Sequence, residues 1–301
     1  MAQGSYVKTP ISRKGWLNRR DLLILLMPTI FIIFSLTIFP FIYSLILSFH
    51  KWNMMEPVGW KFIGLQNYRR MFFEDSLFWL SLRVSISYLV ATVSAQFVCG
   101  LAVALLLNRD LRVKGIIRTL VVLPMMATPV AVGLIWRFMY NTDLGMVNYL
   151  LSVVGIEKLD WLGNIKTGFW AVVITDVWQW TPFMVLILLA ALQALPYDLY
   201  EAVSIEGANR LQAFRYITLP LIKPAILIAL LIRIMESFKT FDIIFVLTGG
   251  GPGATTQVLS LYTYKVGFRL FEMGQASALS FFMLIIVLVI ANIFLKVMSK
   301  Q

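Results

Sequence analysis

Long apolar runs are the feature of this chain that most restricts its fold. Only 14% of the residues are charged, whereas soluble domains carry about 25%. A helix needs roughly 20 apolar residues to cross about 30 Å of hydrocarbon, and six runs reach that length: 22–49, 79–107, 119–140, 168–194, 225–247 and 276–297. A backbone in lipid must satisfy its own hydrogen bonds, so such runs favour helices over strands. We therefore predict an all-α polytopic membrane protein with a six-helix transmembrane domain over residues 22–297.

The basic residues predict how these spans are oriented. Positive charge dominates the tail 1–21 and the connection between the second and third spans, through Lys8, Arg13, Lys14, Arg19, Arg20, Arg109, Arg112, Lys114 and Arg118. The first, third and fifth connections mix both signs. Because basic loops stay on the cytoplasmic side, we predict a multi-pass protein with both termini, 1–21 and 298–301, in the cytoplasm. The segment 196–224, between the fourth and fifth spans, is then cytoplasmic as well.

Residue counts exclude several kinds of site. Cysteine and histidine occur once each, as Cys99 and His50, so this chain alone offers no thiolate or histidine metal site and no His-containing catalytic triad. The net charge of +11 is explained by cytoplasmic loops, and we predict no nucleic-acid partner. The sequence G-x-x-x-x-G-K-[ST], which binds nucleotide phosphates, does not occur. We predict no catalytic residues in this chain.

A polar segment between the fourth and fifth spans carries the most informative motif. It reads Glu201-Ala202-Val203-Ser204-Ile205-Glu206-Gly207, followed by Ile217-Thr218-Leu219-Pro220. Asp198, three residues before Glu201, fits a helix cap. Small residues at Ala202, Gly207 and Ala208 would let a neighbouring surface approach closely, although glycine within a helix costs about 1 kcal/mol relative to alanine. This spacing predicts a helix that contacts a neighbouring surface. The alternative is an ordinary amphipathic helix that lies on the inner membrane face.

This segment resembles the cytoplasmic EAA signature of importer permeases of the ABC class. The signature reads E-A-A, three residues, Gly, nine residues, then I-x-L-P, and the chain departs from it only by Val203 in place of alanine. The resemblance implies a coupling helix that docks into an ATP-binding subunit. It also implies that ATP and Mg are bound by that partner and that this chain carries no cofactor. The residues it assigns to that contact are Glu201, Ala202, Val203, Glu206, Gly207, Ala208, Ile217, Leu219 and Pro220.

A second stretch narrows the resemblance. Phe238-Lys239-x-Phe241-Asp242 and the run from Leu247 to Gly253 are similar to the upstream member of paired carbohydrate permeases, such as the maltose and glycerol-3-phosphate systems. That family implies alternating access in a bacterial or archaeal cytoplasmic membrane. Its implied partners are a second homologous permease, an ATP-binding subunit dimer and an extracytoplasmic solute-binding protein.

Charged and aromatic residues within the fourth and fifth spans are candidates for a solute path. Arg233, Glu236, Lys239 and Asp242 recur every three residues, a spacing that predicts the pairs Arg233–Glu236 and Lys239–Asp242 along one helix face. Aromatic rings beside amide and hydroxyl groups suit a sugar, and with the maltose resemblance they give the candidates Asp176, Gln179, Trp180, Phe183, Arg233, Glu236, Ser237, Lys239 and Asp242. A structural ion-pair seam and plain helix packing are the alternatives.

Other functions remain open at this stage. Arg83, Arg233 and Lys239 would suit an anionic solute, such as a uronate oligomer or a sugar phosphate. An ion-coupled secondary transporter would use the buried charges of the fifth span as a relay, although no convincing similarity between the two halves supports inverted repeats. A membrane enzyme acting on lipid head groups would need acids or histidines clustered at one interface, and the acids are scattered.

Overall fold

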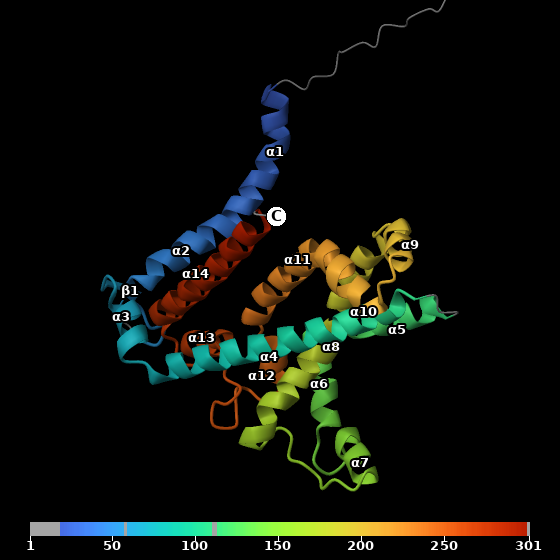
Figure 1. The fold of residues 1–301 in the computed structure, drawn as a ribbon. Coiled ribbons are helices and arrows are strands. Elements are labelled where there is room, and N and C mark those ends of the chain that lie inside the picture. The colour runs from blue at the N-terminus through green and yellow to red at the C-terminus, as the bar shows by residue number, and fades with distance from the viewer. Residues whose placement is uncertain (1–18, 57–58, 110–112, 300–301) are drawn as a thin grey trace, which may run out of the picture.

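The structure is a computed structural model that describes residues 19–56, 59–109 and 113–299 (Figure 1). Most of the tail 1–21 and the last two residues of the segment 298–301 lie outside the described residues. Five helical segments within the described part are long and apolar enough to cross a membrane, and a bent pair brings the number to six when its two halves are counted as one span. The all-α membrane fold predicted from the apolar runs is therefore confirmed.

Helices account for most of the described chain. They are α1 (Arg19–Ile33), the π-helical segment η1 (Phe34–Ile38), α2 (Phe39–Ser48), α3 (Gln66–Phe73), α4 (Ser76–Leu107), α5 (Lys114–Met126), α6 (Pro129–Met139), α7 (Met146–Val153), α8 (Ile165–Gln193), α9 (Tyr197–Ile205), α10 (Arg210–Ala213), the π-helical segment η2 (Phe214–Thr218), α11 (Leu219–Phe238), α12 (Asp242–Leu247), α13 (Leu259–Phe268) and α14 (Met273–Met298). The two-residue strands β1 (His50–Lys51) and β2 (Lys61–Phe62) pair antiparallel after the first span.

The third span is bent, which differs from the continuous helix predicted over residues 119–140. The axes of its two halves, α5 and α6, meet at 97°, and Ala127 and Thr128 between them are extended. Pro129 explains the break, because proline disfavours a helical conformation in the residue before it and suits the first position of a new helix. The Thr128 side chain accepts a hydrogen bond from the Ala131 amide and caps α6.

The fifth span also differs from its predicted bounds of 225–247. The helical run begins at Arg210, passes through η2 and α11, and ends at Phe238. The chain then turns, with the Thr240 amide donating to the Ser237 carbonyl at 3.3 Å, and resumes as α12 at Asp242. Lys239 and Asp242 therefore lie at a break in the helix and not on one continuous helix face.

The long helices α4 and α8 cross at close range in the core (Figure 1). A Cβ atom placed on Gly100 of α4 would lie 2.5 Å from the Cβ atom of Met184 on α8. Small residues allow helix backbones in membranes to approach this closely. Beyond Gly100, the two helices and α11 share an apolar cluster of Ala104, Leu107, Val185, Leu188, Leu189, Leu192, Ile222 and Ile226.

Replacing Gly100 with alanine tests this contact. We expect Gly100→Ala to lower the free energy of unfolding by about 1–3 kcal/mol, because an overpacked core must shift its neighbours. The midpoint of thermal unfolding of the purified protein in detergent measures the effect. Gly115→Ala on α5 is the control, since nothing lies within 4 Å of the added Cβ atom. Equal midpoints for the two variants would contradict the close contact.

Candidate functional site

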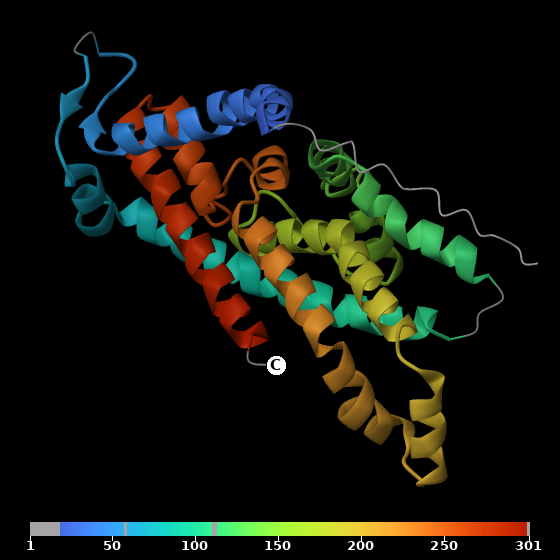
Figure 2. The same ribbon diagram turned by 90° about the horizontal axis from the view of Figure 1, so that it is seen from above.

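The predicted coupling segment forms a projecting pair of short helices. Figure 2 shows α9 and α10 extending beyond the ends of the neighbouring helices. Glu201 and Glu206 are exposed there, and Val203 and Ala208 are half-buried; the Ala202 side chain lies outside the described part. Ile205 is 86% exposed, a large apolar side chain that sequence reasoning did not single out. The segment therefore presents an acidic and apolar surface away from the rest of the chain.

Gly207 ends α9, whereas the sequence analysis places it within a helix. Its φ angle is +81°, a left-handed conformation that glycine adopts at little cost. The Ala208 amide donates to the Val203 carbonyl at 3.2 Å, a bond typical of the Schellman motif at a helix C-terminus. The backbone conformation thus explains this glycine without any close neighbour. Asp198 is likewise not a cap, because α9 begins at Tyr197 and places Asp198 in its first turn.

The second half of the motif lies at the base of the fifth span. Ile217 belongs to η2, while Leu219 and Pro220 open α11. The buried Thr218 between them lies 2.9 Å from the Tyr200 hydroxyl, measured from its Oγ1 atom. This hydrogen bond links α9 directly to the helical run that enters the membrane. The motif therefore contains both a projecting helix and the base of a span.

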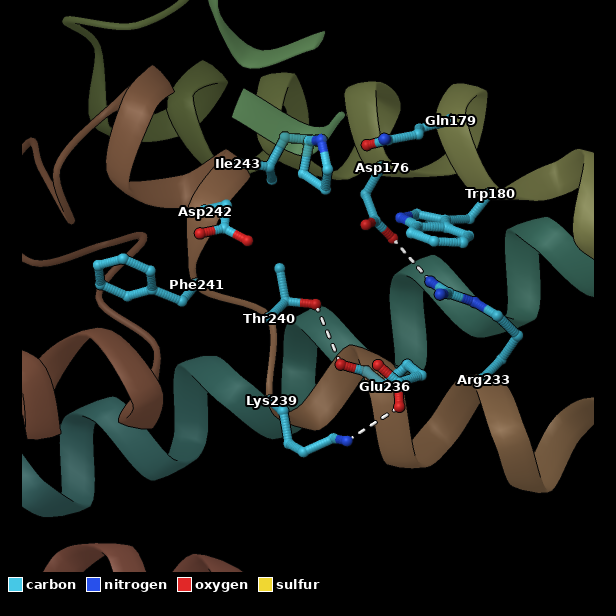
Figure 3. A pocket seen from close by; sticks show the side chains of 11 residues that line it. Asp176, Gln179, Trp180, Arg233, Glu236, Lys239, Thr240, Phe241, Asp242 and Ile243 are labelled. Atoms are coloured by element: carbon cyan, nitrogen blue, oxygen red, sulfur yellow. Dashed lines mark hydrogen bonds and ion pairs between the residues drawn. The ribbon is translucent and has the colours of Figure 1, made fainter. Parts of the chain in front are cut away.

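The solute-path candidates meet at a cavity between α8, α11 and α12 (Figure 3). Its volume is about 220 Å³. Seven of its lining residues are predicted candidates, namely Asp176, Gln179, Trp180, Arg233, Glu236, Lys239 and Asp242, and they are joined by Pro129, Thr240, Phe241 and Ile243. Carboxylate, amide, hydroxyl, cationic and aromatic groups thus converge on one space.

Arg233 is bound inside the protein by partners from other helices. Its Nη2 atom lies 3.3 Å from the Asp176 carboxylate, and its Nε atom donates to Gln96 Oε1 at 2.9 Å. Gln96 Nε2 also donates to Asp176 Oδ2 at 2.8 Å. The Trp180 ring lies 4.8 Å from Arg233 Cζ, a cation–π distance. We call these four residues the Arg233 network; it joins α4, α8 and α11.

Both predicted ion pairs of the fifth span are therefore wrong. Arg233 pairs with Asp176 and not with Glu236, while Lys239 pairs with Glu236 at 2.9 Å and not with Asp242. The buried arginine reaches Asp176 on α8. A buried carboxylate partner satisfies its charge better than Glu236, which is exposed on the same helix as the arginine. Lys239 follows the end of α11, where the break turns Asp242 out of its reach.

Two candidates lie off the cavity wall, and one wall residue keeps an unsatisfied group. Ser237 faces α4, with its buried Oγ atom 3.0 Å from Thr92 Oγ1. Phe183 is half-buried and is not part of the lining. Gln179 donates to the Ala127 carbonyl at the bend of the third span, 3.1 Å away, whereas its buried Oε1 atom has no partner among the described residues.

Sequence reasoning missed the contribution of α4. Gln96 and Thr92 are fully buried in this helix, and both bind candidates from other spans. A buried amide within an apolar transmembrane run is costly unless it is paired, and this cost was the available signal. No group of three or more His, Cys, Asp or Glu side chains able to hold a metal occurs within residues 19–56, 59–109 and 113–299.

The Arg233 network can be tested by removing one partner or both. We expect Asp176→Leu to destabilise the protein by about 3 kcal/mol or more, because it leaves a buried arginine without its carboxylate. Asp176→Leu combined with Arg233→Met should recover most of that loss. Arg233→Met alone is the third variant. Thermal unfolding of all three variants in detergent forms the cycle, and additive losses would contradict a direct pair.

Comparison with known proteins agrees with this architecture. The trehalose/maltose transport system permease protein of Thermococcus litoralis is 38% identical over 274 residues, which are 91% of this chain and 92% of that protein. The sulfoquinovosyl glycerol transport system permease protein of Agrobacterium fabrum is 31% identical over 289 residues, 95% of this chain and 94% of that protein. The trehalose transport system permease protein of Mycobacterium tuberculosis is 36% identical over 279 residues, 93% and 89% of the two proteins.

A solved structure shares the fold. In the crystal structure of a bacterial ABC transporter involved in the import of the acidic polysaccharide alginate, one chain matches with a TM-score of 0.80. The match covers 93% of this chain and 96% of that chain at 24% identity, so it is evidence for the fold alone. Residues 96–300 match the family model for the binding-protein-dependent transport system inner membrane component. The chain therefore belongs to the family of binding-protein-dependent transport system inner membrane components.

Proposed function

We propose that this chain is one membrane-spanning permease subunit of an ATP-driven importer that moves a carbohydrate into the cytoplasm. The cavity between α8 and α11 is the observation that carries the proposal. Trp180 offers an aromatic face there, and Glu236, Lys239 and Thr240 offer hydrogen-bonding groups beside it. A sugar has apolar ring faces and polar edges, so such a wall suits it. The relatives named above are permeases for trehalose, maltose or a sulfoquinovosyl glycerol, which supports the same class.

The candidates have different roles in this proposal. Trp180, Glu236, Lys239 and Asp242 contact the solute, because they line the cavity and are not buried. Gln179 is buried and holds the wall against the bend of the third span through the Ala127 carbonyl. Asp176 and Arg233 hold the wall in place through their mutual pair. Ser237 holds α11 against α4 through Thr92, and Phe183 follows Trp180 on α8 without joining the lining. Alternating access then exposes the cavity to one side of the membrane at a time.

The projecting segment and the cavity suggest which partners the chain needs. An ATP-binding subunit dimer holds ATP and Mg and docks on the surface made by Glu201, Val203 and Ile205 of α9 and by Glu206 in the turn that follows it. A second homologous permease completes the pathway, and an extracytoplasmic solute-binding protein delivers the solute. The alginate transporter was solved in complex with a pentasaccharide-bound periplasmic protein, which supports a partner of this kind. Nothing in the comparisons supports an ion-coupled transporter.

The proposed location is the cytoplasmic membrane of a bacterium or archaeon, with both termini in the cytoplasm. The end of α4, the end of α8 and the start of α11 share one apolar cluster, so the second and fourth connections leave the bundle on the same side. The basic residues Arg109 and Arg118 border the second connection, and the positive-inside rule assigns that side to the cytoplasm. The coupling segment 196–224 then faces the compartment that contains ATP.

Uptake by the whole complex tests the function. We expect liposomes that contain this chain with its partner permease and ATP-binding subunits to accumulate labelled neutral disaccharides only when the binding protein and internal ATP are present. Trehalose, maltose and cellobiose are the probes, and filtration of the liposomes measures uptake. Accumulation driven by a proton or sodium gradient without ATP would contradict the proposal.

A single substitution tests the docking surface. We expect Ile205→Asp to weaken association with the ATP-binding subunit at least tenfold, because a charge replaces an exposed apolar side chain at a contact, a change worth about 1.4 kcal/mol or more. Co-purification of the subunits and ATP hydrolysis per complex measure the loss. Leu144→Asp is the matched control, since Leu144 is 93% exposed on a different connection. Equal loss in both variants would place the contact elsewhere.

A further inference from the structure

The cavity wall carries more negative than positive charge. Three carboxylates line it, from Asp176, Glu236 and Asp242, together with two cationic side chains, Arg233 and Lys239. One negative charge therefore remains after pairing. The consequence for a solute depends on which of these five groups it can reach.

Arg233 cannot serve as a binding group for an anion. Its side chain is 3% exposed, and the Asp176 and Gln96 oxygens already accept hydrogen bonds from it. The Trp180 ring covers the guanidinium. A solute carboxylate would have to displace Asp176, which would leave that acid buried without its partner at high cost.

Lys239 does not change the balance. Its Nζ atom lies 2.9 Å from Glu236 Oε1, and both side chains are about half exposed. An exposed pair of this kind is weak and can open. Whether it is open or closed, it adds one positive and one negative charge to the same wall.

Asp242 is the remaining charge. It is exposed at the start of α12, and its carboxylate is turned toward the open centre of the cavity in Figure 3. No hydrogen bond or ion pair of this carboxylate occurs among the described residues. Like charges repel one another, and an unpaired charge is an effective means of rejecting a competitor.

We infer that Asp242 selects the solute by charge, so that the cavity accepts neutral or cationic sugars, such as amino sugars, and rejects uronates and sugar phosphates. The inference rests on the proposed carbohydrate function and assigns its substrate class. It disagrees with the anionic solute suggested by Arg83, Arg233 and Lys239 in the sequence, because Arg83 is not part of the lining and the other two cations are paired.

Matched sugars test this selection. The complex of this chain with its partner permease and ATP-binding subunits is placed in nanodiscs without the solute-binding protein, so that only the membrane cavity selects. The probes are trehalose, maltose and cellobiose, each compared with its own 6-carboxylate. We expect each carboxylate to bind at least about tenfold more weakly than its neutral parent, a difference of about 1.4 kcal/mol. Higher salt should strengthen carboxylate binding and leave neutral binding unchanged, because ions screen the repulsion.

Variants then assign the selection to Asp242. We expect Asp242→Asn to reduce the discrimination to less than about threefold, whereas Asp242→Glu keeps the charge and the discrimination. Asp143→Asn, the same change on the connection between α6 and α7, is the control and should behave as the wild type.

The outcomes distinguish a failure of the charge selection from a failure of the proposed carbohydrate function. An Asp242→Asn protein with unchanged discrimination, or a wild type that binds carboxylates as tightly as neutral parents, overturns the charge selection while leaving the carbohydrate function intact. Failure of every neutral sugar and every carboxylate to bind contradicts the proposed function, and with it the inference. The salt response in the wild type needs no variant, so the test stands even where Asp242→Asn fails to fold.

Discussion

The buried contact between Arg233 and Asp176 is the interaction on which the middle of this protein depends. Two charges removed from water are stable only when their pairing and hydrogen bonds are complete, and Gln96 completes them from a third helix. The contact therefore fixes how α4, α8 and α11 lie relative to one another. It also holds the Trp180 ring against the guanidinium, so the aromatic wall of the cavity has one defined orientation.

Two breaks in the helices lie near the Arg233 network, and both border the cavity. The third span bends at Ala127 and Thr128, and the Ala127 carbonyl is bound by the Gln179 side chain. The fifth span breaks between Phe238 and Asp242, beside the same cavity. Non-helical backbone at membrane depth is acceptable only where protein or a polar cavity satisfies it. Both breaks thus place polar groups around a space that straight helices would fill with apolar side chains.

The sequence predicts the spans and the projecting segment better than it predicts the contacts between helices. Apolar length predicts the spans, because lipid leaves a long apolar run few alternatives to a helix. The motif around Glu201 locates the projecting segment. The bend at Thr128 was also readable, since Pro129 restricts the residue before it. In contrast, the partner of Arg233 was not readable from spacing, because i,i+3 rules describe neighbours on one helix and Asp176 is on another. The sequence likewise shows no sign that Gln96 faces the same point, except that an amide is unusual in an apolar run.

The hydrogen bond between Tyr200 and Thr218 has a mechanical consequence. It attaches the projecting helix to the foot of α11, and α11 is 20 residues long, about 30 Å at 1.5 Å per residue. The other end of that rod is Phe238, next to the turn that borders the cavity. A sideways displacement of about 2 Å at the foot, with the helix held at Arg233 about 21 Å away, tilts the rod by roughly 5°. The two ends then move in opposite directions, so a displacement of the projecting helix reaches the turn beside the cavity reduced and with its direction reversed.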